Sequence, residues 1–142
     1  MTIFVRPVRE EDSEKFAKWF LNSDGFHPNI FQFPETYTLC AFKKSEIVAF
    51  LVVEYGPEAQ LLSRLVVNPE ASDLEKALAH RELLKQVIAI GYLQNIPKIY
   101  FVGNVEGTNR LASHIFKQTN PSEQPLFKTD FPVYCLTLRE LE

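Results

Sequence analysis

The chain has 142 residues, the length of one ordinary domain, and its apolar share of 46% includes twelve Phe and five Tyr. The formal net charge is −3, and the Lys and Arg residues are scattered, which excludes the basic stripe typical of nucleic-acid-binding proteins. We therefore expect a single domain over residues 1–142, with a packed core and no nucleic-acid partner.

Neither a membrane span nor a metal site is indicated by the sequence. No apolar run approaches the roughly 20 residues that span a bilayer, and residues 1–6 have the pattern of a strand rather than of a signal peptide. Cys40 and Cys135 lie far apart in apolar runs, without the CxxC or Cys/His spacing of a zinc site. We expect a cytoplasmic protein with buried, reduced thiols and no membrane partner.

The N-terminal segment predicts a strand followed by a helix. Residues 3–8 are rich in β-formers, and the polar stretch 9–13 offers several N-cap residues. The next apolar positions have the i, i+3, i+4 spacing of one buried helical face. They are Phe16, Trp19 and Phe20. Asp24-Gly25 is expected to end this helix.

The middle of the chain predicts three neighbouring strands. The aromatic segment 26–34 contains two prolines, so we interpret it as a loop with buried anchors. Residues 37–42 and 47–55 are β-branched and aromatic runs joined by a short polar linker, which predicts an antiparallel hairpin. A turn leads into residues 60–68, whose end, Leu65-Val66-Val67, is apolar without alternation, as in a strand covered on both faces.

A long helix is expected to start at Ser72 or Asp73, where the pattern changes to a helical period. Its apolar stripe contains Leu74, Ala77, Leu78, Leu84, Val87, Ile88 and Tyr92. Residues 98–102, after Pro97, have the apolar pattern of a buried strand.

The C-terminal third is expected to add a helix and a hairpin. The helix starts at about Gly107, and the hairpin uses residues 126–128 and 133–138. The complete order is β-α-β-β-β-α-β-α-β-β, with a turn after the first helix. This order predicts a mixed α/β fold, with an α+β type of mixed sheet, in which hairpins precede and follow crossover units.

The order of elements and two sequence blocks make the chain resemble the GNAT (Gcn5-related N-acetyltransferase) family. The blocks are residues 65–70, before the long helix, and residues 109–116, after the following strand. The opening Ile3-Phe4-Val5-Arg6-Pro7 is also typical of the family, so the resemblance covers nearly the whole chain. It implies a GNAT-like fold with a central mixed, partly splayed sheet flanked by helices, and acetyl-CoA as the cofactor.

The resemblance also implies where the cofactor binds. In the family, the strand that corresponds to residues 65–67 exposes backbone groups to the pantetheine arm, and a glycine-rich turn at the next helix N-terminus cradles the pyrophosphate. The implied cofactor-binding residues are Leu65, Val66, Val67, Ser72, Leu74, Ala77, Asn109 and Phe116.

The cofactor turn and the acid position depart from the family pattern. Ser72 stands at the first position of the turn, usually Gln or Arg, and Glu75 at a glycine, while the small Ala77 conforms. Asp73 and Glu75 would cap the helix and repel a phosphate, which favours a structural helix start. Phe116 stands where the family usually has the Tyr that protonates the departing thiolate, and Phe has no dissociable proton.

Other residues could supply the acid and the base. Ser113 and His114, on the second predicted helix, and Tyr134, on the last strand, are candidate acids, and each also has a purely structural interpretation. Glu54, at the end of its strand, is the candidate base, with a solvated strand end as the alternative. Arg64 could bind an anionic ligand or pair with a surface carboxylate.

Three functions are compatible with these residues. An N-acyltransferase would use acetyl-CoA and accept a small-molecule or peptide amine between the aromatic loop and the final hairpin. A non-enzymatic GNAT-like protein would instead serve assembly or partner binding. Val102-Gly103-Asn104 and the polar helix start after it are similar to small GNAT-like proteins of short-tailed bacteriophages, which would place the chain in a virion, with virion proteins or copies of itself as partners. A small-molecule sensor would keep the cleft without chemistry.

Overall fold

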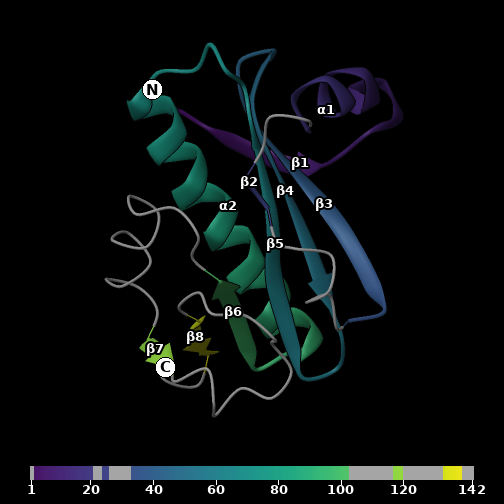
Figure 1. Cartoon of the computed structure of the whole chain (residues 1–142), viewed down its shortest axis with the longest axis vertical. Coiled ribbons are helices and arrows are strands. Elements are labelled where there is room, and N and C mark those ends of the chain that lie inside the picture. Colours follow the sequence, from purple (N-terminus) through teal and green to yellow (C-terminus); the bar gives the residue numbers. More distant parts are fainter. Residues whose placement is uncertain (1, 21–23, 26–32, 103–116, 120–132, 139–142) are drawn as a thin grey trace.

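The fold is built on one sheet, shown in Figure 1. The structure is a computed structural model that describes residues 2–20, 24–25, 33–102, 117–119 and 133–138. Within these residues the sheet has eight strands, seven of them in the order β1-β3-β4-β5-β6-β8-β7, with β2 paired to β5. The strands are β1 (Phe4–Pro7), β2 (Asp24–Gly25), β3 (Glu35–Lys43), β4 (Glu46–Tyr55), β5 (Ala59–Val67), β6 (Lys98–Val102), β7 (Lys117–Thr119) and β8 (Val133–Thr137).

Two α-helices among the described residues cover opposite faces of the sheet (Figure 1). α1 (Ser13–Phe20) follows a short 3-10 helix, η1 (Glu10–Asp12), and α2 (Asp73–Gln94) connects β5 to β6. One face packs against α2 and the other against α1, so the sheet is covered as the sequence predicts. The predicted mixed α/β fold is confirmed.

β3 and β4 form the long hairpin that the sequence predicts. They pair antiparallel from Glu35, opposite Tyr55, to Lys43, opposite Glu46. The two-residue turn between them places Lys44 at φ 56°, in the left-handed region that tight hairpin turns use. Because β5 then adds antiparallel to β4, three strands that are consecutive in sequence are also neighbours in the sheet.

β5 and β6 are parallel neighbours that separate toward one end. Their pairing begins at Ala59 and ends at Leu62, opposite Phe101. β6 stops one residue later, at Val102, whereas β5 continues to Val67. Among the described residues, β2 and not β6 lies along the next part of this edge, at Arg64 and Leu65, so the sheet is partly splayed here, as predicted.

The buried face of α2 repeats every four residues and consists of Ala79, Leu83, Val87 and Gly91. The predicted apolar stripe is therefore wrong in part, since Leu74 is 60% exposed, Tyr92 is 41% exposed and Ala77 is exposed. The buried face lies roughly a third of a turn from the centre of the predicted stripe. A hydrophobicity pattern gives little weight to Ala and Gly, although these small residues let a helix approach a sheet closely.

A buried polar contact ties the C-terminal half of α2 to the sheet. The fully buried Gln60, on β5, donates from Nε2 to the carbonyl oxygen of Val87 at 3.0 Å, and the hydroxyl of Tyr37 donates to Gln60 Oε1. Gly91 lies one turn further along α2, where an added Cβ would be 2.5 Å from Leu138 Cδ1 and 3.1 Å from Gln60 Nε2. Glycine is needed here because helix and sheet are in close contact.

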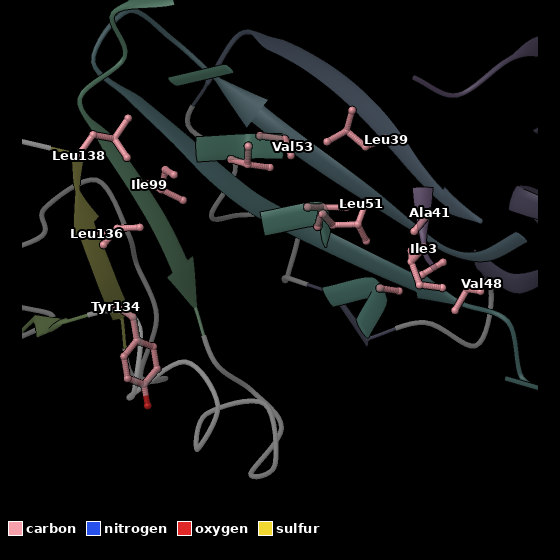
Figure 2. Close-up of a cluster of buried hydrophobic side chains, with 14 residues drawn as sticks. Ile3, Leu39, Ala41, Val48, Leu51, Val53, Ile99, Tyr134, Leu136 and Leu138 are labelled. Atoms are coloured by element: carbon pink, nitrogen blue, oxygen red, sulfur yellow. The ribbon is translucent and has the colours of Figure 1, made fainter. Parts of the chain in front are cut away.

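The largest apolar cluster lies between α2 and the sheet, and Figure 2 shows its side chains. A second cluster on the other face surrounds Phe50, which is fully buried. The α1 residues Phe16 and Trp19 place their rings 5.3 and 5.9 Å from the Phe50 ring, and Phe20 packs on the same cluster. The predicted apolar face of the first helix is confirmed.

Two segments differ from the prediction. Asp24–Gly25, expected to end the first helix, forms β2 and pairs with β5. The last strand, β8, pairs with β6 on one side and β7 on the other, whereas its predicted hairpin partner, residues 126–128, lies outside the described residues. Three polar residues carry no alternating apolar pattern, so the sequence gives no signal for β7. The aromatic loop residues 26–32 and the predicted helix from Gly107 also lie outside the described residues.

Both cysteines are free thiols; Cys40 is fully buried and Cys135 is partly buried. Burial raises the pKa of Cys40 to about 11, so its thiol stays protonated at neutral pH. No group of described His, Cys, Asp or Glu residues is placed to hold a metal ion. In the described part of the chain, no helix combines the length and the apolar character needed to cross a membrane.

Candidate functional site

The end of β5 presents a strand edge to the gap beside β6. The backbone N–H of Asn68, just after β5, donates to the carbonyl oxygen of Val48 at 2.9 Å, so the backbone groups of Asn68 point toward β4. Because these groups alternate in direction along an antiparallel strand, those of Leu65 and Val67 point to the opposite edge. Among the described strands, β2 is the partner there, opposite Arg64 and Leu65. The predicted cofactor strand therefore has its backbone directed into the splay, with part of the edge covered by β2.

The side chains at the end of β5 fix the position of this edge. Val66 is fully buried and packs in the cluster under α1. Asn68 donates from Nδ2 to the carbonyl oxygen of Ile47 at 3.0 Å and accepts the backbone N–H of Glu70 at 2.9 Å. Sequence reasoning missed this anchor. Its signal is an Asn directly before Pro69, since Asn side chains often bond the backbone two residues ahead.

The start of α2 is closed by its own side chains. The Ser72 hydroxyl accepts the backbone N–H of Glu75 at 3.1 Å, and the Glu75 carboxylate accepts the backbone N–H of Ser72 at 2.9 Å. The hydrogen bonds from Ser72 hold the pKa of Glu75 below its usual value, and Lys43 Nζ lies 3.7 Å from its other oxygen. Leu74 and Ala77 are both exposed here. Two N–H groups that could bind a phosphate are thus already used, and a carboxylate stands beside them.

Glu54 is a buried carboxylate on the face of the sheet that α1 covers. It is two strand residues beyond Val52 and four beyond Phe50, so the three share a face, and it is 4% exposed. Its Oε2 atom has no hydrogen-bond partner among the residues that the structure describes. Burial raises the pKa of Glu54, while hydrogen bonds from the Ser63 hydroxyl and the backbone N–H of Phe33 partly oppose this shift. The alternative of a solvated strand end is wrong, because the Glu54 side chain is buried.

A β-bulge places Ser63 and Arg64 next to Glu54. Val53 pairs with Leu62 and Val52 pairs with Arg64, so Ser63 is an extra residue without an opposite partner in the register. Ser63 is 4% exposed and hydrogen-bonds Glu54, which puts its side chain on the α1 face.

The neighbouring side chain, Arg64, lies on the same face. Its guanidinium carbon is 4.2 Å from the centre of the Phe20 ring on α1. Bulges are common beside active sites because they re-aim side chains, and this one gathers a hydroxyl, a carboxylate and a guanidinium at one place.

Tyr134, the candidate acid on β8, is a core residue on the α2 face. It is 4% exposed, and its ring centre is 6.0 Å from that of Phe101 on the neighbouring strand. Figure 2 shows it at one end of the cluster, with its hydroxyl directed away from the aliphatic side chains. Phe101 is also the residue opposite Leu62 in the last parallel pair, so Tyr134 stands close to the point where β5 and β6 separate.

The structure places the two described catalytic candidates three strands apart in the sheet and on opposite faces. Glu54 is opposite Leu61 on the α1 face, and Tyr134 is two strands beyond Leu62 on the α2 face. They do not touch each other. The other candidates, Ser113, His114, Asn109 and Phe116, lie outside the described residues.

No family model and no curated protein sequence matches the chain, but solved structures do. A GNAT-family acetyltransferase from Staphylococcus aureus Mu50 has a TM-score of 0.70 at 16% identity, with 96% of this chain and 99% of that one covered. The ribosomal-protein-S18-alanine N-acetyltransferase from Escherichia coli has a TM-score of 0.69 at 13% identity, covering 96% and 94%.

A third structure, a GNAT-family acetyltransferase from Elizabethkingia anophelis with acetyl-CoA bound, has a TM-score of 0.58 at 13% identity, covering 95% and 97%. Identities this low show the architecture, and all three proteins are matched along almost their whole length. The mixed sheet, the separated parallel pair and the two covering helices of this chain are therefore those of the GNAT fold.

Proposed function

We propose that the chain is an acetyl-CoA-dependent N-acyltransferase. The observation that carries the proposal is the edge of β5 beyond its pairing with β6, where the backbone of Val67 points away from β4 and has no partner among the described strands. The neighbouring strand β4 carries a buried carboxylate, Glu54. An extended amide chain can pair with such an edge. The E. anophelis structure has acetyl-CoA bound, and the E. coli enzyme is an alanine N-acetyltransferase, which supports the same ligand and reaction class here.

The described residues fit one half of the cofactor better than the other. The pantetheine arm needs backbone groups, and Val67 can supply them, with Val66 packed in the cluster under α1, whereas Leu65 is already opposite Asp24 of β2. The pyrophosphate needs N–H donors at the start of α2, where Ser72 and Glu75 already bind each other. Binding there requires this contact to open, so we expect a modest affinity.

The remaining implied positions belong to the same proposal. Leu74 and Ala77, exposed in the first turns of α2, would border the pyrophosphate. Asn109 and Phe116 would border the cofactor from the second sequence block. Their roles rest on the resemblance alone.

Glu54 and Tyr134 have the chemistry that the transfer requires. Acetyl-CoA, when bound, supplies a thioester. The incoming amine forms a bond to the acyl carbon, the bond from that carbon to sulfur breaks, and the amine proton passes to Glu54. The raised pKa of Glu54 makes it a stronger base than an exposed carboxylate. Tyr134 returns a proton to the sulfur from the other face, and Ser113 is the alternative donor.

Calorimetric titration with acetyl-CoA and CoA tests the proposal, and absence of heat at millimolar ligand would overturn it. For the chemistry, Glu54→Gln is compared with Glu46→Gln, an exposed residue at the start of the same strand. Removal of a general base is expected to lower kcat by about 10²- to 10⁴-fold, and the control variant should keep the activity of the unaltered chain. Equal activity of the two variants would exclude Glu54 as the base.

A second candidate function is favoured by the closed start of α2. A helix that caps itself through Ser72 and Glu75 needs no ligand, as expected for a non-enzymatic GNAT-like protein with an assembly role. The titration separates the two functions, because this alternative predicts no binding of acetyl-CoA or CoA. Its partners would be further copies of the chain or virion proteins, and light scattering of the purified protein would report the first of these.

A further inference from the structure

We propose that the protein binds a phosphate monoester of a small organic molecule in a cavity separate from the residues assigned to acyl transfer. The cavity lies between the segment that runs from β1 to α1 and the turn that joins β3 to β4, and its volume is about 410 Å³. Pockets for small molecules typically have about 300–1,000 Å³, so this one has room for a small ligand. None of the described residues proposed for acyl transfer lines it.

The cavity is positively charged, although the chain as a whole has a net charge of −3. Four cationic and two acidic side chains line it, which leaves an excess of two positive charges. They are Arg6, Arg9, Glu11, Asp12, Lys15 and Lys44. A phosphate monoester carries a charge of about −1.5 to −2 at pH 7, so it matches this excess, whereas a monoanion leaves part of it uncompensated.

Two of these charges neutralise each other and form a fixed part of the wall. Arg6 donates two hydrogen bonds to the Asp12 carboxylate, at 2.6 and 3.0 Å, and the Asp12 side chain is 5% exposed. Because the Arg6 donors are used in this way, the ligand depends on the other three cations.

The other three cations have donors available. Lys15, on α1, and Lys44, in the β3–β4 turn, form no salt bridge within the described part of the chain. Arg9 contacts Glu11 at 3.5 Å, and both side chains are more than 60% exposed, so this pair is weak and leaves most of the guanidinium N–H groups for a ligand. Ser45, which also lines the cavity, adds a hydroxyl donor.

The convergence of these side chains favours a compact anion with more than one charge. Arg9, Lys15 and Lys44 come from three different segments, and without a ligand their like charges around one cavity repel. A phosphate group can accept hydrogen bonds from several of them at once, because its charge is spread over three terminal oxygens.

Phenyl phosphate and phenyl sulfate are suitable probes, because they share a ring and three terminal oxygens but the phosphate carries the higher charge. Calorimetric titration should show phenyl phosphate binding at least about 10-fold more tightly than phenyl sulfate. At ten times its dissociation constant, phenyl phosphate should raise the melting temperature by about 4 °C. Equal affinity for the two probes, or no heat with millimolar phenyl phosphate, would overturn the proposal.

A double variant, Lys15→Gln with Lys44→Gln, tests the site itself. Both lysines are exposed, so the variant should fold, and its affinity for phenyl phosphate should fall by about 10- to 100-fold. Lys18→Gln is the matched control, since Lys18 is exposed on the same helix but does not line the cavity, and it should keep the full affinity. An equal rise in melting temperature in all three chains would indicate a general effect of the anion and would overturn the site.

Competition with CoA identifies the source of the phosphate, because CoA itself carries a phosphate monoester. We expect phenyl phosphate to bind with unchanged affinity in the presence of saturating CoA. Displacement by CoA would assign the cavity to the cofactor and overturn a separate ligand. If CoA does not bind at all, the proposed acyl transfer fails, whereas binding of phenyl phosphate that depends on Lys15 and Lys44 would still support this site.

Discussion

A single methyl group added at Gly91 tests how closely α2 packs on the sheet. A Cβ at this position would lie 2.5 Å from Leu138 Cδ1 and 3.1 Å from the Ile96 carbonyl oxygen, whereas ordinary contacts are 3.4–4 Å. The leucine methyl would have to move by about 1 Å in an interior that is already close-packed. Leu138 is 3% exposed and belongs to the main cluster, so its displacement disturbs further side chains.

Two opposing terms set the size of the effect. Overpacking a core costs about 1 to 3 kcal/mol, and replacing Gly by Ala inside a helix gains up to about 1 kcal/mol. We therefore expect Gly91→Ala to lower the free energy of unfolding by about 1 kcal/mol. The comparison is sharper in a chain that already carries Leu138→Ala, because the clashing Cδ1 atom is then absent. In that background the loss should be smaller, although the contacts at 3.1 Å with the Ile96 carbonyl oxygen and with Gln60 Nε2 remain.

Urea unfolding followed by circular dichroism measures all four chains of this cycle under one buffer. The expected outcome is a smaller loss in the Leu138→Ala background, with a coupling of at least about 1 kcal/mol between Gly91 and Leu138. Stabilisation of the otherwise unaltered chain by Gly91→Ala would refute the close approach of α2. An equal loss in both backgrounds would show that Leu138 is not the obstacle.

Two further predictions concern carboxylates whose pKa values shift in opposite directions. Asp12 accepts two hydrogen bonds from Arg6, at 2.6 and 3.0 Å, and these hold the pKa of Asp12 below its usual value. The variant Asp12→Asn should therefore have a free energy of unfolding lower by about 1 to 3 kcal/mol at pH 7, and thermal melts should show this difference fading as the pH drops below about 4. Burial raises the pKa of Glu54, so Glu54→Gln should raise the free energy of unfolding by on the order of 1 kcal/mol at pH 7. This gain should disappear as the pH falls from the pKa of Glu54 in the folded chain toward its pKa in the unfolded chain. Melts that show no gain at pH 7 would contradict a buried, charged carboxylate.

The sequence predicts the long elements well, because periodicity and turn residues act locally. The β3–β4 hairpin follows from two β-branched runs and a short polar linker, and the start of α2 follows from Ser72 and the change of period. The buried face of α2 is mispredicted because it depends on Gly91 and Ala79, whose value lies in their small size and not in their hydrophobicity. β7 and β2 have no local signal, since two or three polar residues become strands through their partners alone.

The candidate site shows the same division between local and long-range information. Glu54 can be selected from its position at the end of a strand, but its burial and its contact with Ser63 depend on a bulge in the neighbouring strand. A bulge is a difference in register between two strands, and one sequence segment does not contain it. Arg64 is ambiguous in sequence for the same reason, because the bulge and Phe20 together determine which face it occupies.

The proposed mechanism relates the positions of Glu54 and Tyr134 to the end of the pairing between β5 and β6. Acyl transfer needs a proton removed from the amine and a proton delivered to the sulfur, and one group rarely serves both ends of the reaction. The parallel pairing ends at Leu62 and Phe101, and β2 takes the same edge of β5 at Arg64 and Leu65. Glu54 lies one strand from Leu62 on the α1 face, and Tyr134 lies one strand beyond Phe101 on the α2 face. The proposed activity therefore requires a gap between β5 and β6 through which both side chains could reach one acceptor, and this requirement is stricter than the loss of any one of the substituted motif residues.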